Sequence, residues 1–150
     1  MPRWPAAVAL AVALSVVPAS DAGLHGRGDR AAAAAIVKTK GYRPDLSTWD
    51  SFFKLNVLIG TFASSADGYN KRAFFFFGRR YLGTDAAAPS AQLEEVWRDD
   101  KTIALLYILY RGSDPNCCPT GGGAIVRFRW NGSRLVALDR IPPRSGRLHR

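Results

Sequence analysis

The sequence is poor in the side chains that carry most enzymatic and metal chemistry. Its 150 residues include two histidines and two cysteines. His25 lies among glycines near the N-terminus and His149 is the penultimate residue, so neither is expected to have the rigid setting that a general base needs. The cysteines are neighbours, and no second Cys or His pair stands at zinc-ligand spacing. We therefore predict no enzyme activity, no metal and no cofactor.

The sequence also lacks an apolar run long enough to cross a membrane, which takes roughly 18 or more residues. The apolar stretch 6–17 is shorter, follows Arg3, and ends in the small residues before Gly23. This is the layout of a secretory signal. We expect a signal peptide at 1–22, cleaved between Ala22 and Gly23, and a secreted or extracytoplasmic protein without a transmembrane segment. The alternative, a buried N-terminal helix, would alternate polar and apolar residues.

Acidic residues are scarce relative to basic ones. There are 12 of the former and 21 of the latter, and the net charge is +9. Cleavage would remove Arg3 and Asp21, one charge of each sign, so the net charge would persist. Outside a cell such a field attracts anionic envelope polymers or lipid headgroups rather than DNA, and specific nucleic-acid binding is not expected. The codon bias of a GC-rich genome is an alternative explanation, since it raises arginine and alanine without any functional demand.

One domain, residues 30–143, fits the remaining length, with a flexible leader at 23–29 and a frayed tail at 144–150. Asp29 stands where a helix N-cap belongs, and Gly41 where the helix should end. An apolar stripe of small side chains should pack this helix against a sheet; its members are Ala32, Ala35, Ile36 and Thr39.

Extended apolar runs separated by turn residues follow from position 54 onward. Six strands are expected, at 55–62, 73–81, 95–98, 102–110, 124–130 and 135–141. Asn131-Gly132 predicts a type I′ hairpin between the last two. The fold class is therefore α+β, with one N-terminal helix packed on a mostly antiparallel sheet of about six strands.

Alternation within these runs indicates burial. Residues 102–110 are apolar at both sets of alternate positions, and Phe74–Phe77 are likewise continuous, which predicts central strands covered on both faces. The 124–130 strand instead alternates apolar residues with Arg127 and Arg129, which predicts a basic face in water.

The two cysteines, Cys117 and Cys118, lie in a turn-rich segment. Adjacent Cα atoms are about 3.8 Å apart across a trans peptide, less than most disulfides span, so a bridge between them would be strained. We favour a structural vicinal disulfide. Two free or intermolecularly paired thiols, or a redox pair, remain open alternatives.

Three glycines follow the cysteines, but they lack the Lys-Ser/Thr ending of a phosphate loop and precede a strand. We expect a turn whose backbone N–H groups could face an anion. The candidate ligand-binding residues are Arg111, Thr120, Gly121, Gly122, Gly123, Arg127 and Arg129.

Three segments taken together resemble a known family: Ala73 to Phe77 running into Tyr81-Leu82-Gly83-Thr84-Asp85, then Ile103 to Tyr110, then Asp114 to Gly122 with its Cys-Cys-Pro. This combination resembles the LppP/LprE family of actinobacterial lipoproteins. The resemblance spans roughly 33–143 and implies a cell-envelope or secreted protein, while leaving its activity open. No cysteine follows the signal core to receive a lipid, so we expect release or loose wall association rather than lipid anchoring.

We therefore expect a non-enzymatic binding module for envelope components. One alternative is a thiol-disulfide protein that uses the vicinal cysteines. Another is an interaction subunit of an envelope complex, in which the aromatic strands complete a partner's sheet.

Overall fold

The computed structural model describes residues 22–148, and the predicted signal peptide lies outside them apart from Ala22. Two α-helices, one 3-10 helix and eight strands make up this part of the chain. In chain order they are α1 (Ala22–Thr39), β1 (Tyr42–Asp45), η1 (Leu46–Thr48), β2 (Leu55–Phe62), β3 (Lys71–Phe77), β4 (Arg80–Thr84), β5 (Leu93–Arg98), β6 (Thr102–Ile108), β7 (Gly123–Trp130), β8 (Leu135–Ala137) and α2 (Arg144–Arg147).

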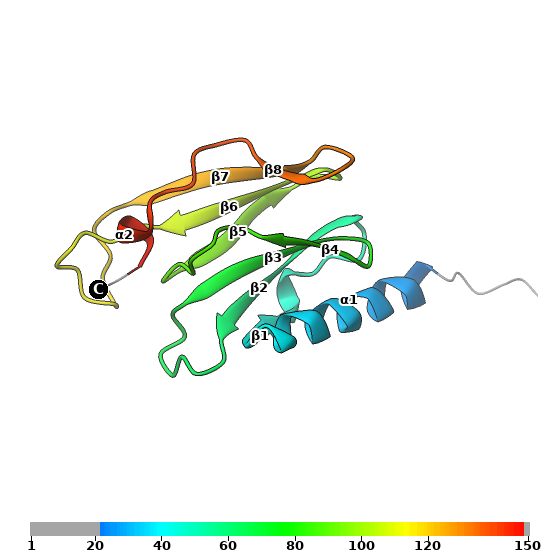
Figure 1. Ribbon diagram of the computed structural model, residues 1–150, viewed down its shortest axis with the longest axis horizontal. Helices are drawn as coiled ribbons and strands as arrows, with labels where there is room; N and C mark the ends of the chain where they lie inside the picture. The colour runs from blue at the N-terminus through cyan, green and yellow to red at the C-terminus, as the bar shows by residue number, and fades with distance from the viewer. Residues whose placement is uncertain (1–21, 149–150) are drawn as a thin grey trace, which may run out of the picture.

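The strands form two four-stranded sheets, in the orders β1-β2-β3-β4 and β5-β6-β7-β8, and every pairing is antiparallel (Figure 1). The α+β class with one long helix is confirmed, whereas the single sheet of about six strands is wrong. The predicted strand 73–81 is in fact the hairpin β3–β4, which turns at Gly78 with a φ of 55°. Strand β1 was missed because it contains Pro44, which is tolerated at the edge of a sheet.

The two sheets pack face to face and enclose the larger core. Strands β2 and β3 contribute Leu55, Val57, Ala73 and Phe75 to it, and the second sheet contributes Leu93, Ile103, Leu105, Tyr107, Val126, Phe128 and Trp130. Aromatic pairs bridge the sheets, with ring centroids 5.0 Å apart for Phe75 and Phe128 and 5.2 Å apart for Phe77 and Trp130. Arg98 adds a polar bridge, since it donates to Asn56 Oδ1 and to the Thr48 carbonyl.

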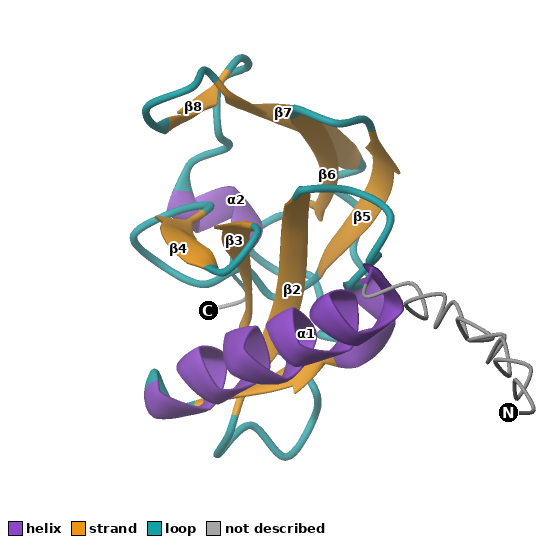
Figure 2. Ribbon diagram, turned by 90° about the vertical axis from the view of Figure 1, so that its right-hand side faces the viewer, coloured by secondary structure: helices purple, strands orange, loops and turns teal. Residues whose placement is uncertain are grey.

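Helix α1 covers the other face of the first sheet (Figure 2). Over residues 29–39, where the burial of the helix is described, the buried residues are Ala33, Ala34 and Val37, so the predicted stripe is rotated on the helix. Because residues 31–35 are all alanine, the amphipathic pattern of the sequence does not show which side of the helix is buried. The helix comes close because Gly60 lies beneath it: a Cβ there would be 2.9 Å from Tyr42 Cβ and 3.1 Å from Val37 Cγ1.

Both ends of the domain differ from expectation. Residues 23–29, predicted to be a flexible leader, form the first turns of α1, because glycine lowers helix propensity without forbidding a helix. Residues 144–148, predicted to fray, include α2 and the buried Arg147, which is 4% exposed. The Arg147 side chain donates to the carbonyls of Pro142 and Ala88 and to Ser90 Oγ, and these bonds hold the C-terminal segment on the body of the domain.

Strands β7 and β8 are antiparallel neighbours, as predicted. Their turn is not the two-residue type I′ turn, because the last pair is Trp130 with Leu135 and only Gly132 of the loop has a positive φ, at 98°. Asn131 instead accepts hydrogen bonds at Oδ1 from the backbone N–H groups of Ser133 and Arg134. An asparagine side chain thus closes a longer loop.

Strand β6 lies inside its sheet, as predicted, but its outward face is not covered by a further layer. Ile103, Leu105 and Tyr107 face the inter-sheet core. On the opposite face the neighbouring Trp97 and Ile125 are 52% and 58% exposed. The expectation that this strand is covered on both faces is therefore wrong, whereas the same expectation for Phe74–Phe77 holds for Phe74, Phe75 and Phe76, each fully buried.

Candidate functional site

The cysteines lie in the long connection between β6 and β7. Cys117 and Cys118 are joined to each other in a disulfide, and both residues are exposed. The Cys118 N–H donates to the Pro115 carbonyl at 3.0 Å. The bridge therefore closes a small turn on the surface, where reagents can reach it.

Asp114 organises this connection from within. Its carboxylate accepts hydrogen bonds from the N–H groups of Arg111 and Thr120 and from the Thr120 hydroxyl, each at 2.7 Å. The backbone bonds from Thr120 and Arg111 hold the pKa of Asp114 below its usual value. The backbone donors of this turn thus surround a carboxylate that belongs to the protein itself.

Two tyrosines tie the same connection to the body of the domain. The hydroxyls of Tyr69 and Tyr110 both donate to the Asn116 carbonyl, at 2.7 and 3.1 Å. Gln92 in turn donates to the Tyr110 hydroxyl at 3.1 Å. The residue preceding the disulfide is therefore fixed from two directions.

The glycines extend the strand pairing rather than form an open cradle. Gly121 N–H donates to the Leu109 carbonyl, and Leu109 N–H donates to the Gly122 carbonyl. A Cβ at Gly121 would lie 2.5 Å from the Leu109 oxygen, so only glycine allows this approach. Gly122 has a φ of 78°, and Gly123 pairs with Ile108. The N–H groups of Thr120 and Gly121 are thus already used inside the protein.

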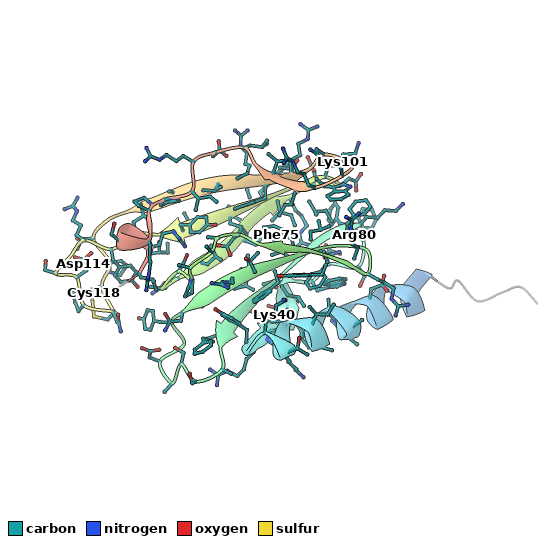
Figure 3. The ribbon with its side chains drawn as sticks, viewed as in Figure 1. Lys40, Phe75, Arg80, Lys101, Asp114 and Cys118 are labelled. Carbon is teal, nitrogen blue, oxygen red and sulfur yellow. A yellow bond between two sulfur atoms is a disulfide. The ribbon has the colours of Figure 1, made fainter. Side chains whose placement is uncertain are left out.

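The seven predicted ligand-binding residues do not form one site. Arg111 and residues 120–123 lie at the cysteine-containing end, whereas Arg127 and Arg129 lie further along β7. Figure 3 shows Asp114 and Cys118 at one end of the molecule and Lys101 and Arg80 at the other. Arg129 belongs to the latter end, because it pairs with Thr102 across the sheet.

Arg127 is engaged by an acidic neighbour. Its Nε and Nη2 donate to the two carboxylate oxygens of Asp139, both at 2.9 Å. These bonds and the adjacent guanidinium lower the pKa of Asp139 to about 2. The predicted basic face of β7 is therefore neutralised at position 127 but not at 129.

A basic and aromatic cleft surrounds Arg129, and we call it the Arg129 cleft. Its volume is about 390 Å³, and it is lined by Phe77, Lys101, Arg129, Trp130, Asn131 and Gly132. The backbone N–H of Trp130 donates to the Lys101 carbonyl, which joins the two neighbouring turns. The Arg80 guanidinium lies over the Trp130 ring, 5.5 Å from its centroid. Two cations, Lys101 and Arg129, thus line one hollow together with Phe77 and the largely buried Trp130.

The sequence analysis found Arg129 but missed Lys101 and Trp130, which line the same cleft. The signal that could have found them lies in the turns. In an antiparallel meander, the turn before β6 and the turn after β7 meet at the same end of the sheet. Lys101 occupies the first of these turns, and Trp130 precedes the second.

A buried polar cluster lies between the sheets, away from both surfaces. Asp85, 4% exposed, accepts from Ala73 N–H at 3.0 Å and from the Tyr107 hydroxyl at 2.9 Å. Burial raises the pKa values of both Asp85 and Tyr107. The Arg147 guanidinium lies over the Tyr107 ring, 5.7 Å from its centroid. Because solvent barely reaches these groups, the cluster is suited to holding the fold rather than to binding a substrate.

Within residues 22–148, no three His, Cys, Asp or Glu side chains gather closely enough to hold a metal ion. In the same part of the chain, no helix is long and apolar enough to cross a membrane.

Comparison with known proteins agrees with the sequence pattern. The model of the LppP/LprE lipoprotein family matches residues 47–133. The curated proteins named putative lipoprotein LppP, from Mycobacterium bovis and Mycobacterium tuberculosis, are 31% identical over 86 residues, which cover 57% of this chain and 47% of each relative. The chain thus spans about half the length of the curated relatives it matches. No solved structure matches it.

Proposed function

This chain belongs to the LppP/LprE lipoprotein family, and from that premise we propose that it is a non-enzymatic binding module of the cell envelope that recognises anionic polymers or lipid headgroups through the Arg129 cleft. Membership of a lipoprotein family supports the proposed envelope location. The observation that carries the binding function is that Lys101 and Arg129 line the same cleft.

The cations of the cleft are available to a ligand. Among the described residues, arginines 79, 98 and 127 form ion pairs within the protein, whereas Lys101 and Arg129 form none. Two positive charges lining one cleft favour a negatively charged group.

The net charge supports the same proposal. A charge of +9 attracts anionic surfaces from a distance. Lys101 and Arg129 in the cleft would then contact the anionic group directly. The cysteine-containing end is less suited to the role, because its backbone donors face Asp114.

Co-sedimentation with phosphatidylcholine vesicles, with and without phosphatidylglycerol, tests the proposal. We expect binding only to the anionic vesicles, weakening as salt increases. Each Lys or Arg close to an anionic surface contributes about 1 kcal/mol, so the double variant Lys101→Gln/Arg129→Gln should bind roughly tenfold or more weakly. Competition by dextran sulfate would show that a soluble polymer uses the same site.

The matched control is Arg111→Gln/Arg144→Gln, which removes the same number of charges from two exposed positions outside the cleft. We expect it to keep most of the binding. Equal losses in the two double variants would mean that net charge alone drives adsorption, and the proposed site would then be wrong.

A further inference from the structure

A second hollow lies near the C-terminal end of α1, between the helix and the edge strand β1. We call it the helix-edge groove. Its volume is about 450 Å³, within the range of small-molecule sites. Its lining residues are Ala34, Lys38, Tyr42, Arg43, Pro44, Leu46 and Ala63. Apart from Arg43 and Lys38, these are apolar or aromatic side chains.

The floor of the groove is built from rigid elements. Ala34 and Tyr42 are each 7% exposed and belong to the core beneath α1. Tyr42 is held by edge-on ring contacts with Phe62 and Phe74, at centroid distances of 5.4 and 5.1 Å. Leu46, which is 45% exposed, forms part of the rim of the groove. The small side chains of Ala34 and Ala63 leave the hollow open.

Two cations lie at this otherwise apolar site. Lys38 is in the last turn of α1 and Arg43 is in β1, and both are exposed. Arg43 is oriented by one hydrogen bond, from Nη2 to the Ser65 carbonyl at 3.0 Å. This bond uses one of its five N–H donors. An apolar floor with positive charges beside it is complementary to an apolar chain with an anionic head.

The open edge of β1 is poorly suited to an added peptide strand. The strand has only four residues, and Pro44 among them has no N–H to donate. Peptide binding by strand addition relies on those backbone hydrogen bonds. The groove therefore favours an occupant that needs none of them.

We propose that the helix-edge groove binds the acyl chain of an anionic amphiphile, with its phosphate or carboxylate head at Lys38 and Arg43. The chain lies against Tyr42, Pro44 and Leu46. This site is separate from the Arg129 cleft and does not depend on the function proposed for that cleft.

The probe is dodecyl phosphate, kept below its micelle concentration and titrated calorimetrically into the domain. Each buried methylene contributes about 0.8 kcal/mol, or roughly fourfold in affinity. Octyl phosphate should therefore bind at least about tenfold more weakly even if the groove covers only half of the missing methylenes, and butyl phosphate should give no measurable binding. Dodecyl maltoside, which has the same chain and no charge, should also bind more weakly.

Two variants, each with a matched control, locate the site. Ala63→Trp fills the groove from an exposed position and should abolish saturable binding, whereas Ala87→Trp, on an exposed loop elsewhere, should not. Lys38→Gln should weaken binding roughly fivefold, the value of an exposed ion pair. Lys54→Gln removes the same charge outside the groove and should change little. Each variant is first shown to keep the wild-type unfolding midpoint.

Unchanged affinity in Ala63→Trp, or equal affinity for the butyl and dodecyl phosphates, would overturn the proposal. The Lys101→Gln/Arg129→Gln variant should keep its dodecyl phosphate binding. Loss of binding in that variant would place the ligand in the Arg129 cleft and also count against the groove.

Discussion

Replacing Tyr107 by phenylalanine removes one oxygen atom from the interior of the domain. That hydroxyl donates to Asp85 Oδ2 at 2.9 Å. Tyr107 is fully buried and Asp85 is 4% exposed, so water cannot take over the bond. A buried acceptor that loses its donor costs about 1–3 kcal/mol. Because Asp85 keeps its bond from Ala73 N–H, we expect Tyr107→Phe to lower the free energy of unfolding by about 2 kcal/mol.

Urea unfolding at neutral pH measures this loss, and Tyr69→Phe is the matched control. The Tyr69 hydroxyl donates to the Asn116 carbonyl, which also accepts from Tyr110. This acceptor stays satisfied in the control variant, so its loss should be below about 1 kcal/mol. Equal losses in the two variants would refute the reasoning that the buried cluster holds the sheets together.

The pH dependence gives the prediction a second readout. Burial, the largest influence on Asp85, raises its pKa, so the folded state holds a proton at pH values where the unfolded chain has released it. The contribution of this group to stability is complete below the unfolded pKa, about 4, and declines as the pH rises through the raised folded value. The Tyr107 hydroxyl opposes this rise in the pKa of Asp85, because its hydrogen bond stabilises the ionised carboxylate. Tyr107→Phe should therefore lower the free energy of unfolding most at pH values above the folded pKa of Asp85, and least at pH values below the unfolded pKa.

Three further outcomes are expected. Gly60→Ala should lower the free energy of unfolding by about 1–3 kcal/mol in urea, because its Cβ would overpack the space under α1; an unchanged midpoint would contradict that close packing. The pKa of Asp139, about 2, lies below its unfolded value. The stability from its pair with Arg127 is therefore present above about pH 4 and is lost as the pH falls toward 2. Arg127→Gln should remove the loss of stability between these pH values when acid unfolding is followed. Intact mass after alkylation should show no label on Cys117 or Cys118 without reductant and two labels with it; labelling of both sulfurs without reductant would exclude the bridge.

The sequence predicted individual strands better than their assembly. Strand β2 has the predicted bounds, 55–62, because both of its faces are apolar and turn residues flank it. The hairpin at Gly78 was read as a continuous strand, since Phe77 and Tyr81 supply apolar residues on either side of the turn. Periodicity describes which side of a strand is buried, and it does not say against which sheet.

The candidate site was only partly predictable for a related reason. Arg129 stood out because it alternates with Phe128 and Trp130 along one strand. Lys101 joins it only through the antiparallel register, in which Thr102 pairs with Arg129. The prediction for the glycine turn did not foresee Asp114, whose side chain occupies the donors that an external anion would need. Contacts of this kind depend on the tertiary arrangement, and composition does not reveal them.

Helix α1 explains why two similar apolar strands have different surroundings. Strand β3 is buried on both faces because α1 packs on its outer side. Strand β6 has the same continuous pattern, but the one long helix can cover only one of the two sheets. Ala104 is nevertheless only 4% exposed, because it is small and its register partners, Trp97 and Arg127, flank it with long side chains. A continuous apolar run thus indicates a central strand in both sheets, while the number of helices decides how many sheet faces remain in water.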